Sequence, residues 1–349
     1  MTDKFPVLLL LFNRPDLTEG VVRKLKHYSP NKLYIAIDGP RTSQEGEAAL
    51  CLSVREMVDK MVDWPCGKEW LVREWNLGCG PAVKTALDWF FEHEESGMIL
   101  EDDCHPSPDF FRFQQEMLQS HRDDERIFMV SGNNFLPECV ESRTPVYLSK
   151  YTSIWGWGTW RRSWLDYQFT YSEDESTDWQ HVIQTAACSS AESVYWMKEF
   201  NKLCGVKTPH TWDIQLQFSV WKHGRKNIFP SKNLVTNHGL RSDATHTRNF
   251  NERLFRTTRD FKVDLLNGAL PSYDPDIDLM LFWLHVLEGN PKRFKQLLLD
   301  ADPESHKNIE ATLDAIRLRE DPSLADLISL ANKWVRKQIS RVYLNLRKK

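Results

Sequence analysis

Three consecutive carboxylates follow a short apolar run. Residues 98–100 are Met-Ile-Leu, and Glu101, Asp102 and Asp103 come directly after them. A buried strand over this run would place the three carboxylates at its C-terminal end. Adjacent carboxylates repel one another, and a shared cation relieves that repulsion. Their hard oxygen ligands suit Mg²⁺ or Mn²⁺ carried with a diphosphate, so the run indicates an enzyme that handles a nucleotide-activated substrate. The alternative is an acidic surface turn.

The composition excludes several classes of protein. The chain has 349 residues, of which 41% are hydrophobic and 27% charged, as is ordinary for a soluble globular protein. A net charge of −4 supplies no basic field, so nucleic acid is not an expected partner. The seven cysteines form no CxxC pair, which argues against a disulfide framework or zinc site and favours the cytoplasm. No signal peptide or bilayer-spanning run is expected at the N-terminus.

Strand-like and helix-like segments alternate through the first part of the chain. Apolar runs predict strands at 7–12, 33–37, 69–75, 98–100 and 127–130, with helices between them. This alternation predicts an α/β fold, Rossmann-like, with a mostly parallel sheet covered on both faces. Ligands of such sheets bind beyond the C-terminal ends of the strands. The polar residues expected there are Asn13, Arg14, Asp38, Asn76 and 101–103.

The pattern changes after residue 131. Residues 154–160 read as a Gly/Trp loop, 211–222 as a helix, and 231–249 as a polar loop. We expect a catalytic domain over 1–272 and a C-terminal helical appendage over 273–349. Residues 333–349 combine basic residues with an apolar stripe. A helix of this kind can lie on an anionic membrane surface, and the alternative is a packed terminal helix.

Seven ordered segments carry a resemblance to a known family. They read LLLFNRP, YIAIDGP, REWNLGCG, ILEDDC, WGWGTWRRSW, WDIQL and FPSKNLVTNHGLRSDATHT. In this order the chain resembles nucleotide-sugar glycosyltransferases of the GT-A fold. It looks most like a bacterial relative of the N-acetylglucosaminyltransferase I type and of hemolysin-like nucleotide-diphospho-sugar transferases. The resemblance covers about residues 7–247.

The resemblance implies a UDP-sugar donor and Mn²⁺ or Mg²⁺ as cofactor. By it, Asp103 would ligate the metal and Asp102 would hold the ribose. Asp38 would accept a hydrogen bond from uracil N–H; the alternative for this residue is a turn. Among the remaining donor-binding candidates, Asn13 and Arg14 at the first strand end would approach the nucleotide. Arg73, Asn76 and Lys84 lie near the third strand and the helix that follows it. Lys84 or Arg73 could contact phosphate, and the alternative for either is a surface charge.

Inverting sugar transfer needs a base for the acceptor hydroxyl. Asp213 is the candidate, with N-cap duty as its alternative and Asp178 as a weaker candidate. His246 falls where the related family has a metal-binding histidine, and His238 is the alternative.

Trp155, Trp157 and Trp160 would present aromatic faces to the acceptor from a loop that folds over the donor. The alternative is a core tryptophan cluster.

The predicted reaction is transfer of a sugar to a glycan or lipid-linked acceptor in bacterial surface polysaccharide synthesis. It would take place in the cytoplasm or at the cytoplasmic face of the inner membrane. A sugar nucleotidyltransferase is an alternative, which the run 12–15 disfavours because it replaces a Gly-rich phosphate loop. A non-catalytic carbohydrate-binding module is the other alternative.

Overall fold

Apolar segments of the N-terminal half build one side of the sheet. The computed structural model describes residues 4–136, 144–239, 257–261 and 270–282. Strand β1 (Val7–Leu11) is buried along its whole length. It lies between two parallel neighbours, β2 (Lys32–Ile37) and β4 (Ser96–Glu101), and β3 (Gly67–Val72) is parallel to β2 at the edge. These four strands confirm four of the predicted ones, although β3 begins and ends earlier than expected.

Four further strands continue the sheet. They are β8 (Trp157–Trp160), β6 (Ile127–Ser131), β9 (Lys226–Pro230) and β7 (Val146–Ser149), and the full order is β3-β2-β1-β4-β8-β6-β9-β7. Strand β8 runs antiparallel to β4 and β6, and β7 runs antiparallel to β9. The other adjacent pairs are parallel, so the predicted α/β fold with a mostly parallel sheet is confirmed.

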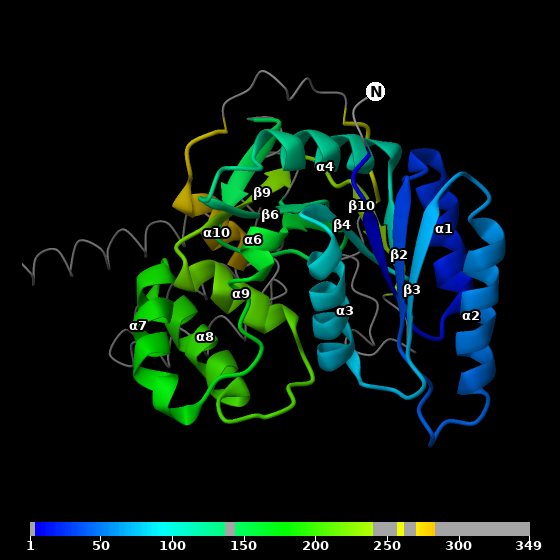
Figure 1. Cartoon of the computed structure of the whole chain (residues 1–349). Helices are drawn as coiled ribbons and strands as arrows, with labels where there is room; N and C mark the ends of the chain where they lie inside the picture. Colours follow the sequence, from blue (N-terminus) through cyan, green and yellow to red (C-terminus); the bar gives the residue numbers. More distant parts are fainter. Residues whose placement is uncertain (1–3, 137–143, 240–256, 262–269, 283–349) are drawn as a thin grey trace, which may run out of the picture.

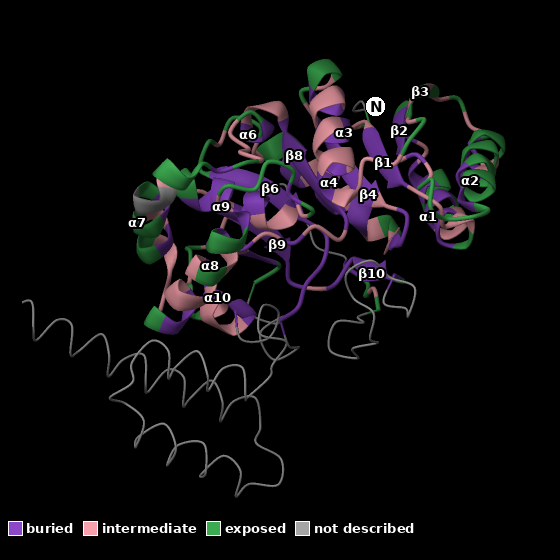
Figure 2. Cartoon of the chain, turned by 90° about the horizontal axis from the view of Figure 1, so that it is seen from below, coloured by how far each residue is buried: buried purple, intermediate pink, exposed green. Residues whose placement is uncertain are grey.

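Helices cover both faces of this sheet (Figure 1). Val7, Leu9 and Leu11 of β1 pack with α1 (Pro15–Tyr28), α2 (Glu47–Met61) and α4 (Pro108–Ser120). Leu8 and Leu10 point to the other face, where they pack with α3 (Cys79–His93). Alternate side chains of a strand point to opposite faces, so an uninterrupted apolar run is what a strand between two helix layers requires. Figure 2 shows β1 and β4 buried between these layers.

A group of helices lies beyond the end of the sheet formed by β9 and β7. It contains η1 (Glu173–Glu175), α7 (Ser176–Ala186), α8 (Ser190–Leu203), α9 (Asp213–Lys222) and α10 (Pro275–Leu281). The short helix α6 (Arg161–Trp164) follows β8 and packs instead against α3, where Trp164 stacks on Phe91. The core of the helix group is aromatic: Phe218 lies within 6 Å of Trp179, Trp196 and Phe200, measured between ring centroids. The sequence predicted α9, and α10 falls within the helical region expected over 273–349. The other helices were not predicted, because the aromatic side chains that bury this group follow no single helical period.

Two expectations for the second half are corrected. Residues 157–160 form strand β8 instead of part of a Gly/Trp loop, because their backbone pairs with β4 and β6. The stretch expected as a polar loop from 231 contains β10 (Val235–Asn237), antiparallel to β5 (Cys104–Pro106). The appendage beyond residue 282, including 333–349, lies outside the described residues. Among those described, no helix is both long and apolar enough to cross a membrane.

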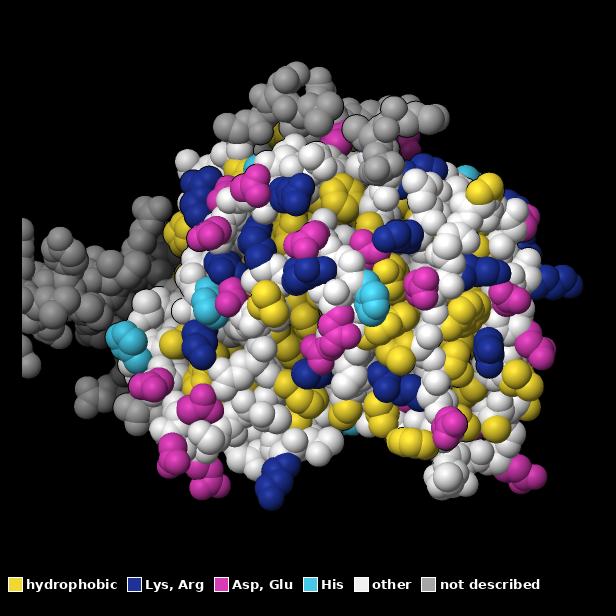
Figure 3. Space-filling view, in the orientation of Figure 1, with side chains coloured by type: hydrophobic (Ala, Val, Ile, Leu, Met, Phe, Trp, Pro, Cys, Tyr) yellow, Lys and Arg dark blue, Asp and Glu magenta, His cyan; other side chains and the backbone are white. Residues whose placement is uncertain are grey.

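The surface agrees with the small net charge. On the face shown in Figure 3, acidic and basic side chains are interspersed, and no patch of one sign dominates.

Candidate functional site

The carboxyl ends of β1 and β4 form a switch point in the sheet. After β1 the chain passes through α1 to β2 on one side, whereas β4, on the other side of β1, is entered from α3 on the opposite face. The strand order therefore reverses between β1 and β4, and open α/β sheets bind their ligands in the crevice at such a reversal. Arg14 follows β1, and Asp102 and Asp103 follow β4.

An ion pair bridges this switch point. Arg14 Nε donates to Asp102 Oδ2 at 2.9 Å, and Arg14 Nη2 donates to Asp102 Oδ1. The same Nη2 lies 3.0 Å from Asp103 Oδ2. The guanidinium therefore binds one carboxylate with two parallel bonds and contacts the next, which is the strongest geometry for such pairs. Pro15 begins α1 directly after Arg14, so the helix start holds the arginine at the strand end.

The carboxylates of this site are buried. Asp102 is 3% exposed and Asp103 is 8% exposed. Burial raises the pKa of Asp102 to about 6, although the Arg14 charge acts in the opposite direction. Burial, together with the charges of Asp103 and Asp102, also raises the pKa of Glu101 well above its usual range. Among the described residues, Glu101 Oε1 is buried without a hydrogen-bond partner. The site therefore carries more negative charge than one arginine balances.

The turn after β10 closes around Asp103. Asn237 lies opposite Cys104 in the β10–β5 pair, and the His238 backbone N–H donates to the Asp103 carbonyl oxygen at 2.9 Å. A Cβ on Gly239 would lie 2.1 Å from Asp103 Oδ2, so any larger residue there would displace the Asp103 carboxylate. The structure thus places His238, the alternative histidine, beside Asp103, whereas His246 lies outside the described residues. The Asn-His-Gly motif could be read from the sequence, but nothing in the sequence indicated that it lies against Asp103.

Asp213 lies close to the same carboxylates. Asp213 is the first residue of α9. The N-cap position, which was the alternative assignment for Asp213, is occupied by Trp212. The charge of Asp213 contributes to the raised pKa values of Glu101 and of Cys79, the first residue of α3. Close packing explains this proximity: Gly80 N–H donates to the His210 carbonyl at 2.9 Å. The start of α3 therefore holds the segment that leads into Asp213.

Asp38 accepts hydrogen bonds from within the protein, and its contact with a base stays a prediction. Its Oδ1 accepts the backbone N–H groups of Gly39 at 2.9 Å and Leu77 at 3.0 Å. Its Oδ2 accepts Asn76 Nδ2 at 2.8 Å and the Gly78 backbone N–H at 3.2 Å. A carboxylate has about four acceptor positions, and these bonds use them all. In this arrangement, Asp38 and Asn76 therefore order the loop between β3 and α3.

Three other donor-binding candidates bond within the protein. Asn13 Nδ2 donates to Glu47 Oε1 at 2.8 Å, and Arg73 Nη2 donates to Thr85 Oγ1 at 2.6 Å. Lys84 Nζ is 2.5 Å from an oxygen of Asp88, one turn further along α3. Asn13 and Arg73 follow strand ends as predicted. These contacts, however, are separate from the Arg14 ion pair, so the structure does not gather all candidates around one point.

The three tryptophans divide between core and partial exposure. Trp157 is 0% exposed and Trp160 is 2% exposed, both within β8. Trp157 stacks on Trp212 with ring centroids 5.9 Å apart. The alternative of a core cluster therefore holds for these two, and the expectation that they face an acceptor from a loop is wrong. Trp155 is half-buried against Phe135.

The oxygen ligands at this site suit a divalent cation that arrives bound to a substrate. In the described part of the chain, no three His, Cys, Asp or Glu side chains are grouped closely enough to hold a metal. Mg²⁺ is commonly bound by one or two carboxylates together with substrate phosphates, without a complete protein cage. Asp103 and the unbalanced negative charge around it fit that mode, while Arg14 already occupies both oxygens of Asp102.

Comparisons with known proteins give only distant likenesses. No family model matches the chain, and no curated protein matches it. HddC from Yersinia pseudotuberculosis is similar at 10% identity and a TM-score of 0.27, over 45% of this chain and 77% of that one.

Two further solved structures are similar at the same level. Apo UDP-glucose pyrophosphorylase has 10% identity and a TM-score of 0.33, over 64% of this chain and 90% of that one. The UTP-bound UGPase from Acinetobacter baumannii has 9% identity and a TM-score of 0.32, over 65% and 85%. Likenesses this slight carry no argument about activity.

Proposed function

We propose that this protein is a transferase that acts on a nucleotide sugar, whose diphosphate binds where β1 and β4 end. The observation that carries the proposal is the Arg14 ion pair with Asp102 and Asp103 at the switch point, with Asp213 close by. This position is where open α/β sheets bind nucleotides. The buried carboxylates favour a cation, and a metal-bound diphosphate supplies one.

Each residue then has a distinct role. Asp103 would bind the cation that accompanies the diphosphate, and that cation would stabilise the negative charge on the leaving group. Arg14 holds the two aspartates in place while the cation is absent. We propose glycosyl transfer as the reaction, with a glycan or lipid-linked acceptor. Asp213, half-buried beside the acidic run, would take the proton from the acceptor hydroxyl.

Nucleotidyl transfer is the competing reaction at such a site. There the attacking group is a sugar phosphate, which is already ionised at neutral pH and needs no base. The two reactions therefore differ in their need for Asp213. Asp213→Asn is expected to lower glycosyl transfer about 10²-fold to 10⁴-fold and to leave nucleotidyl transfer nearly unchanged.

Calorimetric titration with UDP, UTP, GDP, CDP and CMP, with and without Mn²⁺, tests the site first. We expect binding of a uridine nucleotide that strengthens with Mn²⁺, and we expect Asp103→Asn to remove the Mn²⁺ effect. Asp63→Asn is the control, because Asp63 forms an exposed ion pair with Lys26. Binding that is unaffected by Mn²⁺, or by Asp103→Asn, would contradict the proposed metal-diphosphate site.

Product analysis tests the reaction. The protein is incubated with UDP-sugars and glycan acceptors, and separately with UTP and sugar 1-phosphates. Release of UDP in the first assay supports glycosyl transfer. Release of pyrophosphate in the second assay would instead show that the reaction is nucleotidyl transfer. Sugar binding with neither product would point to the non-catalytic carbohydrate-binding module.

A further inference from the structure

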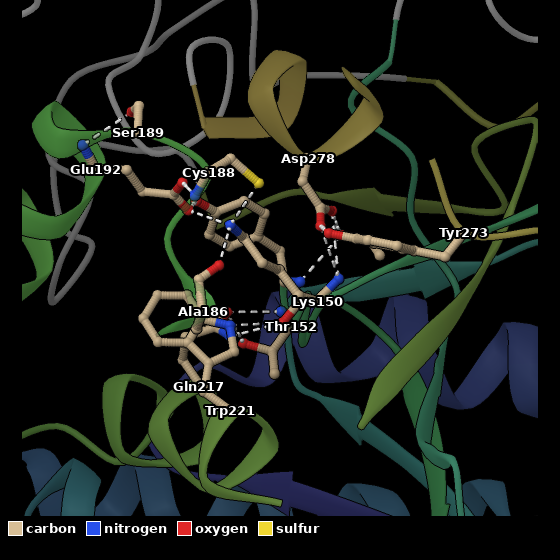
Figure 4. A network of polar contacts seen from close by, with 12 residues as sticks. Lys150, Thr152, Ala186, Cys188, Ser189, Glu192, Gln217, Trp221, Tyr273 and Asp278 are labelled. Carbon is tan, nitrogen blue, oxygen red and sulfur yellow. Dashed lines mark hydrogen bonds and ion pairs between the residues drawn. The ribbon is translucent and has the colours of Figure 1, made fainter. Parts of the chain in front are cut away.

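We propose that Lys150 and Cys188 are an oxidation-sensitive pair, which peroxide joins through a covalent bond between lysine nitrogen and cysteine sulfur. Lys150 Nζ donates to Cys188 Sγ at 3.1 Å (Figure 4). The two residues are 38 positions apart in sequence and lie next to different elements. Lys150 directly follows β7, and Cys188 lies in the connection between α7 and α8. This pair is remote in sequence from every residue of the proposed active site.

The lysine amine is held in one position. The Lys150 side chain is 2% exposed, and its Nζ lies 2.6 Å from Glu192 Oε1. The same Nζ donates to the Ala186 carbonyl oxygen at 2.8 Å. Three partners around one buried ammonium leave it little freedom to move. A nucleophile fixed at contact distance from its target reacts as if at a very high concentration.

The same glutamate also positions the cysteine. The Cys188 backbone N–H donates to Glu192 Oε2 at 2.6 Å, so Glu192 contacts both members of the pair. Asp278 lies on the other side of Lys150 and accepts the Lys150 backbone N–H at 3.2 Å. Tyr273 also donates to Asp278. Figure 4 shows these groups converging from α8, α10 and the end of β7.

The chemistry is an oxidation followed by a condensation. Hydrogen peroxide is the oxidant: the Cys188 thiolate attacks one peroxide oxygen, and the O–O bond breaks to give a sulfenic acid and hydroxide. Glu192 then takes a proton from the Lys150 ammonium. The amine lone pair attacks sulfur, the S–O bond breaks, and the sulfenic hydroxyl leaves as water with a proton from nitrogen. The overall change is the loss of two hydrogen atoms from the protein and formation of one N–S bond.

The charges of Lys150 and Glu192 remain balanced during these reaction steps. Lys150 loses its positive charge when nitrogen becomes bonded to sulfur, and Glu192 is neutral once it holds the lysine proton. The charges of Lys150 and Glu192 are therefore lost together, and neither is left buried without its partner. Asp278 loses the Lys150 charge but keeps the hydrogen bonds from Ser149 and Tyr273. Burial raises the pKa of the Cys188 thiol, although the Lys150 charge acts in the opposite direction. Little thiolate is therefore present, and we expect the oxidation to be slower than that of an exposed thiol.

Peptide mass spectrometry on the full-length protein tests the proposal. Native protein is treated with excess hydrogen peroxide, unfolded, alkylated, digested and analysed before and after reduction with dithiothreitol. We expect one peptide pair joined at Lys150 and Cys188, lighter by two hydrogen atoms than the sum of its parts and separated by reduction. Lys150→Arg keeps the charge but is expected to yield only oxidised or alkylated Cys188.

Cys204 provides the matched control, because its thiol is half-buried and donates to the Ser172 carbonyl. Cys204→Ser should retain the joined peptides in full, and Cys188→Ser should lose them. The proposal is overturned if wild-type Cys188 accumulates as sulfinic acid without a joined peptide. It is equally overturned if Cys188 stays reduced while Cys204 is oxidised. Both results are obtained from wild-type protein, so a folding defect in a variant cannot obscure them.

Discussion

Replacing Arg14 by methionine is the sharpest test of how the acidic site is held together. Arg14→Met keeps most of the apolar stem and removes the guanidinium that bonds Asp102 twice and contacts Asp103. Removing one partner of a buried ion pair costs about 3–5 kcal/mol, because the other charge is left buried and unpaired. The Arg14 side chain is 26% exposed, so we expect the lower end, about 3 kcal/mol at pH 7.

The expected loss depends on pH in a defined direction. Burial raises the Asp102 pKa from 3.8 to about 6, so the native protein binds this proton more readily than the unfolded chain does. The stability that this group contributes therefore increases as the pH falls from 7 toward 4. Without Arg14, whose charge lowers this pKa, the native value rises further. The difference in the free energy of unfolding between variant and wild type should consequently be larger at pH 7, where wild-type Asp102 is mostly ionised, than at pH 5, where Asp102 is protonated in both.

Urea unfolding monitored by tryptophan fluorescence measures this gap. EDTA is present throughout, so that no metal replaces the missing charge. Arg23→Met is the matched control: Arg23 lies on the same helix, and its side chain is 69% exposed in an i,i+4 pair with Glu19. Such surface pairs contribute about 0.5 kcal/mol or less. If Arg14→Met and Arg23→Met destabilise equally, or if the gap grows at pH 5, the ion pair does not hold the site.

Further predictions concern the surrounding loops and the core. Asp38→Ala removes three hydrogen bonds donated by the 74–78 loop and one donated by Gly39, and should cost about 1–3 kcal/mol. Hydrogen exchange at Leu77 and Gly78 should accelerate, and unchanged protection there would refute the bracing role. Gly239→Ala places a Cβ 2.1 Å from Asp103 Oδ2 and should abolish Mn²⁺-dependent nucleotide binding. Gly67→Ala is the control, because its Cβ would lie 3.7 Å from the nearest atom and binding should be unchanged. Equal affinities of the two variants in calorimetry would contradict the close contact between Gly239 and Asp103. Trp157→Ala should destabilise the fold by about 3–5 kcal/mol in urea unfolding, because Trp157 is 0% exposed; loss of acceptor binding without loss of stability would restore the loop interpretation.

Local sequence determined much of the N-terminal half. Residues 7–11, 33–37 and 98–100 are uninterrupted apolar runs, and only a strand covered by helices on both faces buries every side chain of such a run. Apolar residues at helical spacing predicted the helices between these strands. Because the strands are parallel, their C-terminal ends meet at one edge. The sequence alone therefore placed Arg14 and the acidic run at the same edge of the sheet.

Tertiary structure decided what those residues contact. Arg14 and Asp102 are 88 positions apart, and nothing in either local segment specifies their bond. Asp38 follows a strand, as predicted, but the chain after β3 supplies three of the four donors that bond to its carboxylate, and Gly39 supplies the fourth. Residues 157–160 have the composition of a loop, and they become a buried strand because β4 and β6 leave a gap that their backbone fills. Local patterns encode burial and periodicity, whereas pairing between distant segments depends on the packing of the whole sheet.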